Sequence, residues 1–283
     1  MAGSRSRPPR GCAGKDERVI TLFASEAGIN DPFVVPAPIT ELFEFPAFWL
    51  EGTLFAVNRT VLILLLASLL GSALFVLAFR SPSVVPGKLQ NACEVIIEFI
   101  REQIAIQVMG PEGRAFVPFL TTIFIFVWLN NLFEIIPFVN FPPTSRMAIP
   151  GFLAVMIWIV FLVVGMVKQG PRYFWNVAFP PGVPKPIYLL ITPIELISTF
   201  VVRPLTLAVR LFANMVAGHI LLTLLFLAIH AFLFSGLGTP VGLVALAASP
   251  LLVGFELVVG ILQAYIMTIL AAVYIGSSVH PEH

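Results

Sequence analysis

Two apolar stretches, each longer than a bilayer is thick, limit most strongly what this chain can fold into. Residues 187–234 and 241–276 are hydrophobic almost throughout. As helices rising 1.5 Å per residue they would extend roughly 72 and 54 Å, against a hydrocarbon core of about 30 Å. Only six residues, 235–240, join them. We therefore expect a hairpin of two long, steeply tilted helices embedded in the membrane.

The composition agrees with a membrane location. The chain is 58% hydrophobic and 11% charged, with a mean hydropathy of +0.98, whereas soluble domains carry about 25% charged residues. The net charge of +1 gives no reason to expect a nucleic-acid partner. The sequence has no phosphate-binding loop, dinucleotide motif, metal-ligand cluster or nucleophile elbow. It therefore predicts no catalytic centre of its own, no cofactor and no metal site.

The remaining segments complete an all-α integral membrane protein. Three ordinary apolar spans are expected at about 60–79, 117–138 and 147–167. Between the first two, residues 86–109 alternate apolar and charged positions at helical spacing, which predicts an amphipathic helix on the membrane surface. With the hairpin helices at 187–234 and 241–276, the chain makes five crossings. Residues 1–41 are expected to form a polar, flexible tail, and 42–283 one membrane domain.

Basic residues near the ends of the spans predict the orientation. The connections 80–116 and 168–186 together carry seven Lys and Arg side chains, whereas the short loops on the other side offer only Arg59 and Arg146. Cytoplasmic loops are the ones enriched in Lys and Arg. The N-terminus is thus expected outside and the C-terminus in the cytoplasm.

Charged side chains interrupt the first hairpin helix. An ionisable group at bilayer depth costs about 2.5–3.5 kcal/mol on insertion scales, so Arg203 and Arg210 need water, a partner or a function. On a straight α-helix, with 100° per residue, His219 lies opposite Arg210. The same projection predicts one long polar face, formed by Thr192, Thr199, Arg203, Thr206, Arg210 and Asn214, with Glu195 beside it. Two polar pathways, on opposite sides of one helix, would have a permanent cation between them.

The final helix has a polar stripe of its own. Glu256 is a carboxylate in a long apolar helix, and His219 or His230 on the preceding helix is the expected partner. A carboxylate beside an imidazole can pass protons near neutral pH. Arg210 cannot take part in such a relay, because arginine does not lose its proton in proteins. The stripe consists of Ser249, Glu256, Gln263 and Tyr274.

For most of these polar groups a purely structural role remains open. Asn130, Asn131 and Glu134 suit helix–helix contacts and end-capping as well as a channel lining. Arg203 can snorkel or pair with Glu195. For Arg210, in mid-helix, a structural role is the weaker interpretation.

Three motifs resemble the signatures of subunit a of F-type ATP synthases. They are Arg210-Leu211-Phe212-Ala213-Asn214-Met215 followed by Ala217-Gly218-His219, then Leu262-Gln263-Ala264-Tyr265-Ile266, and Asn131-Leu132-Phe133-Glu134-Ile135-Ile136-Pro137. The resemblance covers roughly residues 40–278. The first motif is highly specific to the family. The order and spacing of the three strengthen the match.

The resemblance implies a mechanism. A stator subunit offers two aqueous half-channels that do not meet, and they load and unload protons on a rotating ring of c subunits. Arg210 would face the ring carboxylate, with Asn214 and Gln263 at the exchange site. His219 and Glu256 would serve the outer half-channel, and Glu195 and Thr199 the inner one. Further candidate lining residues are Thr206, Asn131, Glu134, Ser249 and His230.

The resemblance also implies the partners. These are the c-ring, the peripheral-stalk subunit b, other subunits of the synthase and membrane lipid. The chain would be a multi-pass protein of the plasma membrane, not catalytic alone. Two alternatives stay open: an ion-coupled secondary transporter, which would move ions without other subunits, and a purely structural membrane subunit, which would tolerate Arg210→Ala.

Overall fold

A computed structural model describes residues 58–81, 83–136, 142–170, 172–179, 187–233 and 238–279, and within these ranges the chain is helical with no strand. The predicted tail, residues 1–41, lies outside the described residues. So do residues 180–186 in the Pro- and Gly-rich connection.

The first half of the described chain contains two long helical segments. Helix α2 (Arg59–Ala78) begins after Asn58, whose side chain accepts a hydrogen bond from the Val61 amide at 3.0 Å. This cap provides an acceptor for an amide in the first turn that has none within the helix. Helix α3 (Lys88–Phe99) then continues through a π-helical stretch, Ile100–Ile106, into α4 (Gln107–Met109). A 3₁₀ stretch, Gly110–Phe116, leads into α5 (Val117–Ile135).

The second half contains the long hairpin. Helix α6 (Ala148–Gln169) precedes the short α7 (Arg172–Ala178). Helix α8 (Tyr188–Ile197) passes through a second π-helical stretch, Ser198–Val202, into α9 (Arg203–Phe232). The last helix, α10, runs from Thr239 to Val279.

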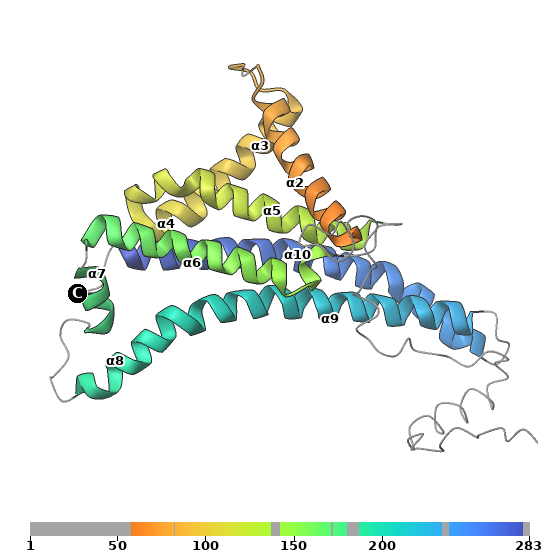
Figure 1. The fold of residues 1–283 in the computed structure, drawn as a ribbon. Coiled ribbons are helices and arrows are strands. Elements are labelled where there is room, and N and C mark those ends of the chain that lie inside the picture. The colour runs from red at the N-terminus through yellow and green to blue at the C-terminus, as the bar shows by residue number, and fades with distance from the viewer. Residues whose placement is uncertain are drawn as a thin grey trace, which may run out of the picture. The chain divides into compact units, whose positions relative to one another are not determined.

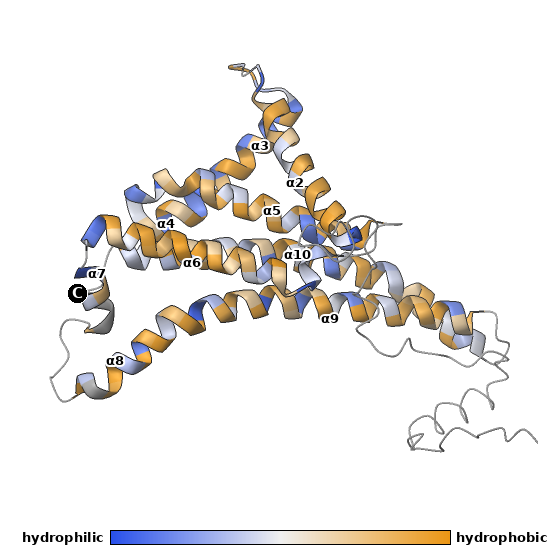
Figure 2. Cartoon of the chain, in the orientation of Figure 1, coloured by the Kyte–Doolittle hydropathy of each residue, from blue (hydrophilic) through white to orange (hydrophobic). Residues whose placement is uncertain are grey.

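The described chain has five helices long and apolar enough to cross a membrane: Arg59–Ala78, Lys88–Ile135, Ala148–Gln169, Leu190–Phe232 and Thr239–Val279. The expected all-helical, five-span fold class is confirmed. Figure 2 shows the apolar character directly, with α2 orange along nearly its whole length. The tilt of the hairpin and the surface position of residues 86–109 remain predictions, since they depend on where the bilayer lies.

The described chain divides into two units, residues 221–252 and residues 58–220 with 253–279, and each is described by itself. The described part of the first unit is the end of α9 and the start of α10. There Gly242 lies so close to the backbone of Leu233 that a Cβ would be 2.5 Å from its amide nitrogen. A larger residue at this position would open the hairpin.

The second unit contains the other helices and the apolar core. Gly71 lets α2 approach α5 closely, because a Cβ there would lie 3.1 Å from the Leu129 side chain. The C-terminal part of α10 packs against both α5 and α6 (Figure 1), with Gly260 beside Asn131 and the Tyr274 ring 6.2 Å from that of Phe161. Fully buried core side chains include Ile104, Leu120, Ile157, Phe161, Leu211, Met215 and Ile275.

Candidate functional site

The two arginines of α9 lie in different surroundings. Arg210 is exposed, on a face of α9 where Thr206, Val209 and Ala213 are exposed as well. Arg203 is half-buried, with its guanidinium 3.8 Å from Glu195 and 5.5 Å from the centre of the Tyr274 ring. Arg210 therefore belongs to the surface of this chain, and Arg203 to its interior packing.

The prediction of one long polar face upstream of Arg203 is wrong. Thr199 is buried and its carbonyl accepts a hydrogen bond from the Trp158 indole at 3.3 Å, whereas Thr206 is exposed. The cause is the π-helical stretch Ser198–Val202, because a π-turn holds more residues than an α-turn and rotates whatever precedes it. Downstream of Arg203 the helical projection agrees with the structure. It placed Arg210 and His219 on opposite faces, and Arg210 is exposed whereas His219 is buried.

Glu256 and His219 are both buried, each with 5% of its surface exposed. Helices α9 and α10 meet between them, because a Cβ on Gly218 would lie 2.6 Å from Oε2 of Glu256. Among the described residues this carboxylate oxygen has no hydrogen-bond partner. The second hairpin helix thus presents an acid to the backbone of the first at Gly218, the residue that precedes His219 in the chain.

Asn130, Asn131 and Glu134 of α5 are all buried, and the last two lie in the same region as Glu256. The Asn131 side chain donates to the Gly260 carbonyl of α10 at 3.2 Å and accepts from the Thr144 hydroxyl at 3.2 Å. The Glu134 carboxyl lies within electrostatic range of Glu256. Asn131 is therefore a structural link between α5 and α10, and Glu134 brings a second acid close to Glu256.

Asn214 and Gln263, which the sequence predicts near the exchange site, both have a buried amide nitrogen. The side-chain nitrogens of Asn214 and Gln263 have no hydrogen-bond partner among the described residues. An unsatisfied buried donor costs about 1–3 kcal/mol. The packing of α9 and α10 therefore bears this cost at both amides.

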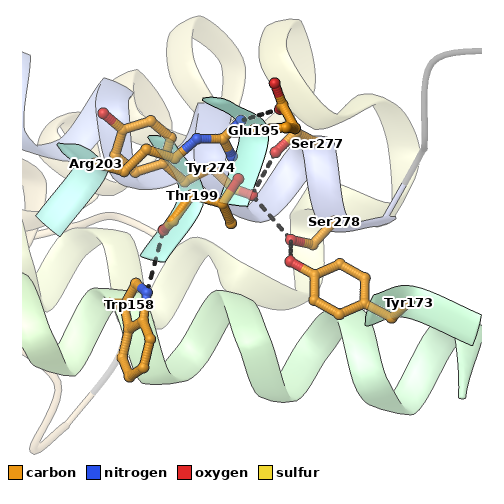
Figure 3. A network of polar contacts seen from close by, with 8 residues as sticks. All are labelled: Trp158, Tyr173, Glu195, Thr199, Arg203, Tyr274, Ser277 and Ser278. Carbon is orange, nitrogen blue, oxygen red and sulfur yellow. Dashed lines mark hydrogen bonds and ion pairs between the residues drawn. The ribbon is translucent and has the colours of Figure 1, made fainter. Parts of the chain in front are cut away.

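A second polar network lies where the end of α10 meets α6, α7 and α8 (Figure 3). The Tyr173 hydroxyl is 3.3 Å from that of Ser278, and the Gln169 side chain donates to the Ser278 carbonyl at 2.8 Å. Burial raises the pKa of the Tyr173 phenol. The ion pair of Glu195 and Arg203 belongs to the same network.

Sequence reasoning missed Trp158, Tyr173 and Ser278. The connection 168–186 between two spans contains α7, and Tyr173 of α7 packs its ring against Gly165. No short-range pattern signals a contact between residues 105 positions apart.

Two predicted lining residues belong to the first unit. Ser249 donates to the Leu246 carbonyl of its own helix at 2.9 Å, and His230 is exposed. The other candidate site residues belong to the second unit.

In the described ranges no group of three or more His, Cys, Asp or Glu side chains could hold a metal ion.

Comparison with known proteins identifies the family. The family described as ATP synthase A chain matches residues 60–276. The chain is 44% identical to an ATP synthase subunit a of Rhodococcus erythropolis over 87% of this chain and 91% of the relative. It is 40% identical to that of Frankia alni (89% and 91% covered) and 36% identical to that of Streptomyces lividans (95% and 96% covered). The expected resemblance is confirmed: the chain belongs to the ATP synthase A chain family.

Proposed function

We propose that this chain is the proton-channel subunit of an F-type ATP synthase, and that it loads and unloads protons on a rotating c-ring through two offset half-channels. The observation that carries the proposal is the position of Arg210. It is an exposed cation on α9 that lies along the helix between two buried polar residues, Thr199 before it and His219 after it.

The outer half-channel is assigned to the residues around Glu256. His219 and Glu256 are the proton-accepting groups, and Glu134 is a second carboxyl within electrostatic range of Glu256. Asn131 holds the two helices together here through its bond to Gly260. Asn214 and Gln263 are assigned to the exchange site with Arg210, and their amide nitrogens have no hydrogen-bond partner among the described residues.

The inner half-channel is assigned to Glu195 and the network at the end of α10. Glu195 pairs with Arg203 here, with 3.8 Å between the carboxylate and the guanidinium. The carbonyl of Thr199 is occupied by Trp158 and the residue is buried, so its part in this half-channel is to pack the wall.

The c-ring would dock on the exposed face of α9. Thr206, Val209, Arg210, Ala213 and Ala217 are all exposed, and the two alanines let another helix approach closely. The ring carboxylate would then stand opposite Arg210, whose charge stabilises the ionised form. Rotation needs each carboxylate to lose its proton here and gain another before it leaves.

The orientation in the membrane and the partner subunits complete the proposal. The chain is a multi-pass subunit of the plasma membrane, with the N-terminus outside and the C-terminus in the cytoplasm. It works only in the complex, with the c-ring, the peripheral-stalk subunit b and the other subunits, and is not catalytic alone.

The test separates this function from an ion-coupled transporter. Vesicles are prepared with the chain alone, with the chain plus c-ring, and with the whole complex, and passive proton conductance is measured. The proposal expects conductance only where the c-ring is present. Ion movement by the chain alone would favour the transporter.

A further inference from the structure

We propose that Trp158 and Pro204 are positioning residues of the inner half-channel. Together they fix the π-helical stretch Ser198–Val202 between α8 and α9, and this stretch holds Glu195 in line with Arg203. The position of Glu195 concerns the helix alone and can be measured without proton flow. Its consequence for proton release rests on the function proposed above.

The π-helical stretch decides how Glu195 is turned relative to Arg203. The two residues are eight positions apart, so at 100° per residue a continuous α-helix would set them about 80° apart. A π-turn closes over one residue more than an α-turn. The extra residue leaves about seven α-helical steps, or about 700°, which brings the two residues to within about 20° of one line. The structure agrees, because the Glu195 carboxylate lies 3.8 Å from the Arg203 guanidinium.

Pro204 explains why the helix leaves the α-register just before it. A proline inside an α-helix clashes with the carbonyl four residues earlier and has no N–H to donate to it. That carbonyl would be the one of Phe200, inside the π-helical stretch. The Arg203 amide donates instead to the Ser198 carbonyl, five residues earlier. Local π-helical turns are one way in which membrane helices accommodate proline.

This change of register removes both helical donors of the Thr199 carbonyl. In the α-register its donor would be the Arg203 amide, which bonds Ser198 instead. In the π-register its donor would be the amide of residue 204, which a proline lacks. Thr199 is only 2% exposed, so water has little access to it. A buried carbonyl left in this state needs a donor from elsewhere, because an unmade hydrogen bond is costly.

The Trp158 indole supplies that donor from α6. Its N–H donates to the Thr199 carbonyl at 3.3 Å (Figure 3). Two aromatic contacts hold the ring in place: it meets the Phe200 ring edge-on with centroids 6.1 Å apart, and Phe200 stacks on Phe174 of α7 at 6.3 Å. Trp158 thus stands in for the amide that Pro204 lacks.

The first test compares Pro204→Ala with Pro193→Ala in the purified ATP synthase complex that contains this chain. Restoring the amide at position 204 lets the helix return to the α-register, so electron cryomicroscopy should show Glu195 turned by about 100° away from Arg203. Pro193 lies in the same helix but before both residues, so Pro193→Ala should leave the ion pair in place. An intact pair in Pro204→Ala would overturn the proposal.

The second test asks whether the indole N–H replaces the missing amide. Trp158→Phe keeps a ring beside Phe200 but loses the N–H. The control is Trp128→Phe, which makes the same change at another partly buried ring, on α5, and measures the effect of the smaller ring on packing. Trp158→Phe should lower the melting temperature of the complex more than Trp128→Phe does.

The same comparison is then made in the Pro204→Ala chain, whose helix supplies its own donor to Thr199. In that background Trp158→Phe should lower the melting temperature no more than Trp128→Phe does. Equal losses from Trp158→Phe with Pro204 and with Ala at this position would overturn the proposal.

The third test measures proton release in reconstituted complexes. Pro204→Ala should slow it without lowering the melting temperature, because the variant gains a backbone donor while Glu195 moves. Trp158→Phe should slow it by about 2- to 12-fold, the factor that corresponds to one net hydrogen bond. In the Arg203→Gln chain, which lacks the ion pair, Trp158→Phe should add no further loss.

The outcomes separate this proposal from the proposed function. The same further loss from Trp158→Phe in the Arg203→Gln chain would show that Trp158 does not act through the ion pair, and would overturn the proposal. Wild-type proton release in Pro204→Ala, with Glu195 turned away from Arg203, would instead refute the inner half-channel as assigned above.

Discussion

The carboxylate of Glu256 lies directly on Gly218, where the two long helices of the hairpin touch. A Cβ on Gly218 would come within 2.6 Å of Oε2 and 2.8 Å of the carboxyl carbon. Real Cβ atoms do not approach so closely, so only glycine leaves this carboxylate where it is. The position of this buried acid thus depends on a missing side chain on the neighbouring helix.

Replacing this glycine should displace the acid without unfolding the chain. In Gly218→Ala the flexible carboxylate tip moves away, and we expect proton-driven ATP synthesis to fall by about tenfold, equivalent to roughly 1.4 kcal/mol on the barrier. The matched control is Gly151→Ala, because no atom lies within 4 Å of a Cβ at that position. The measurement is synthesis in inverted vesicles with equal amounts of assembled complex. Equal rates in the two variants would contradict this account of Gly218.

The buried acid and imidazole are expected to act together. Either His219→Ala or Glu256→Ala should slow proton entry, whereas exchanging the two residues should retain partial function, because both groups remain on the same two helices. Passive proton flux through reconstituted complexes measures this. Wild-type flux in either single variant would reduce the pair to a structural role.

Asn131 should stabilise the packing of α5 on α10. It joins Gly260 and Thr144 through two buried hydrogen bonds, so Asn131→Leu leaves the Thr144 hydroxyl without its acceptor. We expect a loss of about 1–3 kcal/mol in the free energy of unfolding. Thr144→Val removes only one of the bonds and should cost less. Thermal unfolding of the purified complex compares them, and equal stability of Asn131→Leu and wild type would refute the assignment.

The ion pair of Arg203 and Glu195 should matter for proton movement more than for stability. Both side chains are partly exposed, and such pairs contribute at most about 1 kcal/mol. Arg203→Gln should therefore unfold near the wild-type temperature but slow proton release, and Arg203→Lys should restore part of the rate. A large drop in melting temperature with normal proton flux would make the pair structural.

The sequence predicts the helices well because span length and apolar content are local properties. The runs around α2, α6 and α10 were long enough to define each helix, and the spacing of Arg210 and His219 placed them on opposite faces. The π-helical stretch Ser198–Val202 was not predictable in this way. The periodicity of the side chains does not reveal this change of hydrogen-bond register, within which the Thr199 carbonyl accepts the Trp158 indole.

Long-range contacts account for the rest of what was missed. Tyr173 and Ser278 meet across 105 residues, and α2 approaches α5 closely only because Gly71 has no side chain. Asn131 and Glu134 were recognised as polar groups in a span, yet only the packing of α5 on α10 separates the structural amide from the acid beside Glu256.

The central claim concerns the charge of Arg210. At 4 Å and an effective dielectric near 20, a guanidinium and a carboxylate interact by about 4 kcal/mol, which strongly favours the ionised ring carboxylate. A cation that never deprotonates also blocks proton hopping between the two half-channels. Arg210→Lys keeps a charge but loses the planar five-donor fork and the fixed protonation state.

The most direct test measures ATP synthesis and passive proton conductance in membranes with equal amounts of wild-type, Arg210→Lys and Arg210→Ala complexes. We predict that both variants lose ATP synthesis almost completely, and that Arg210→Ala, unlike Arg210→Lys, lets protons leak. Robust ATP synthesis in the Arg210→Ala complex would contradict the mechanism outright.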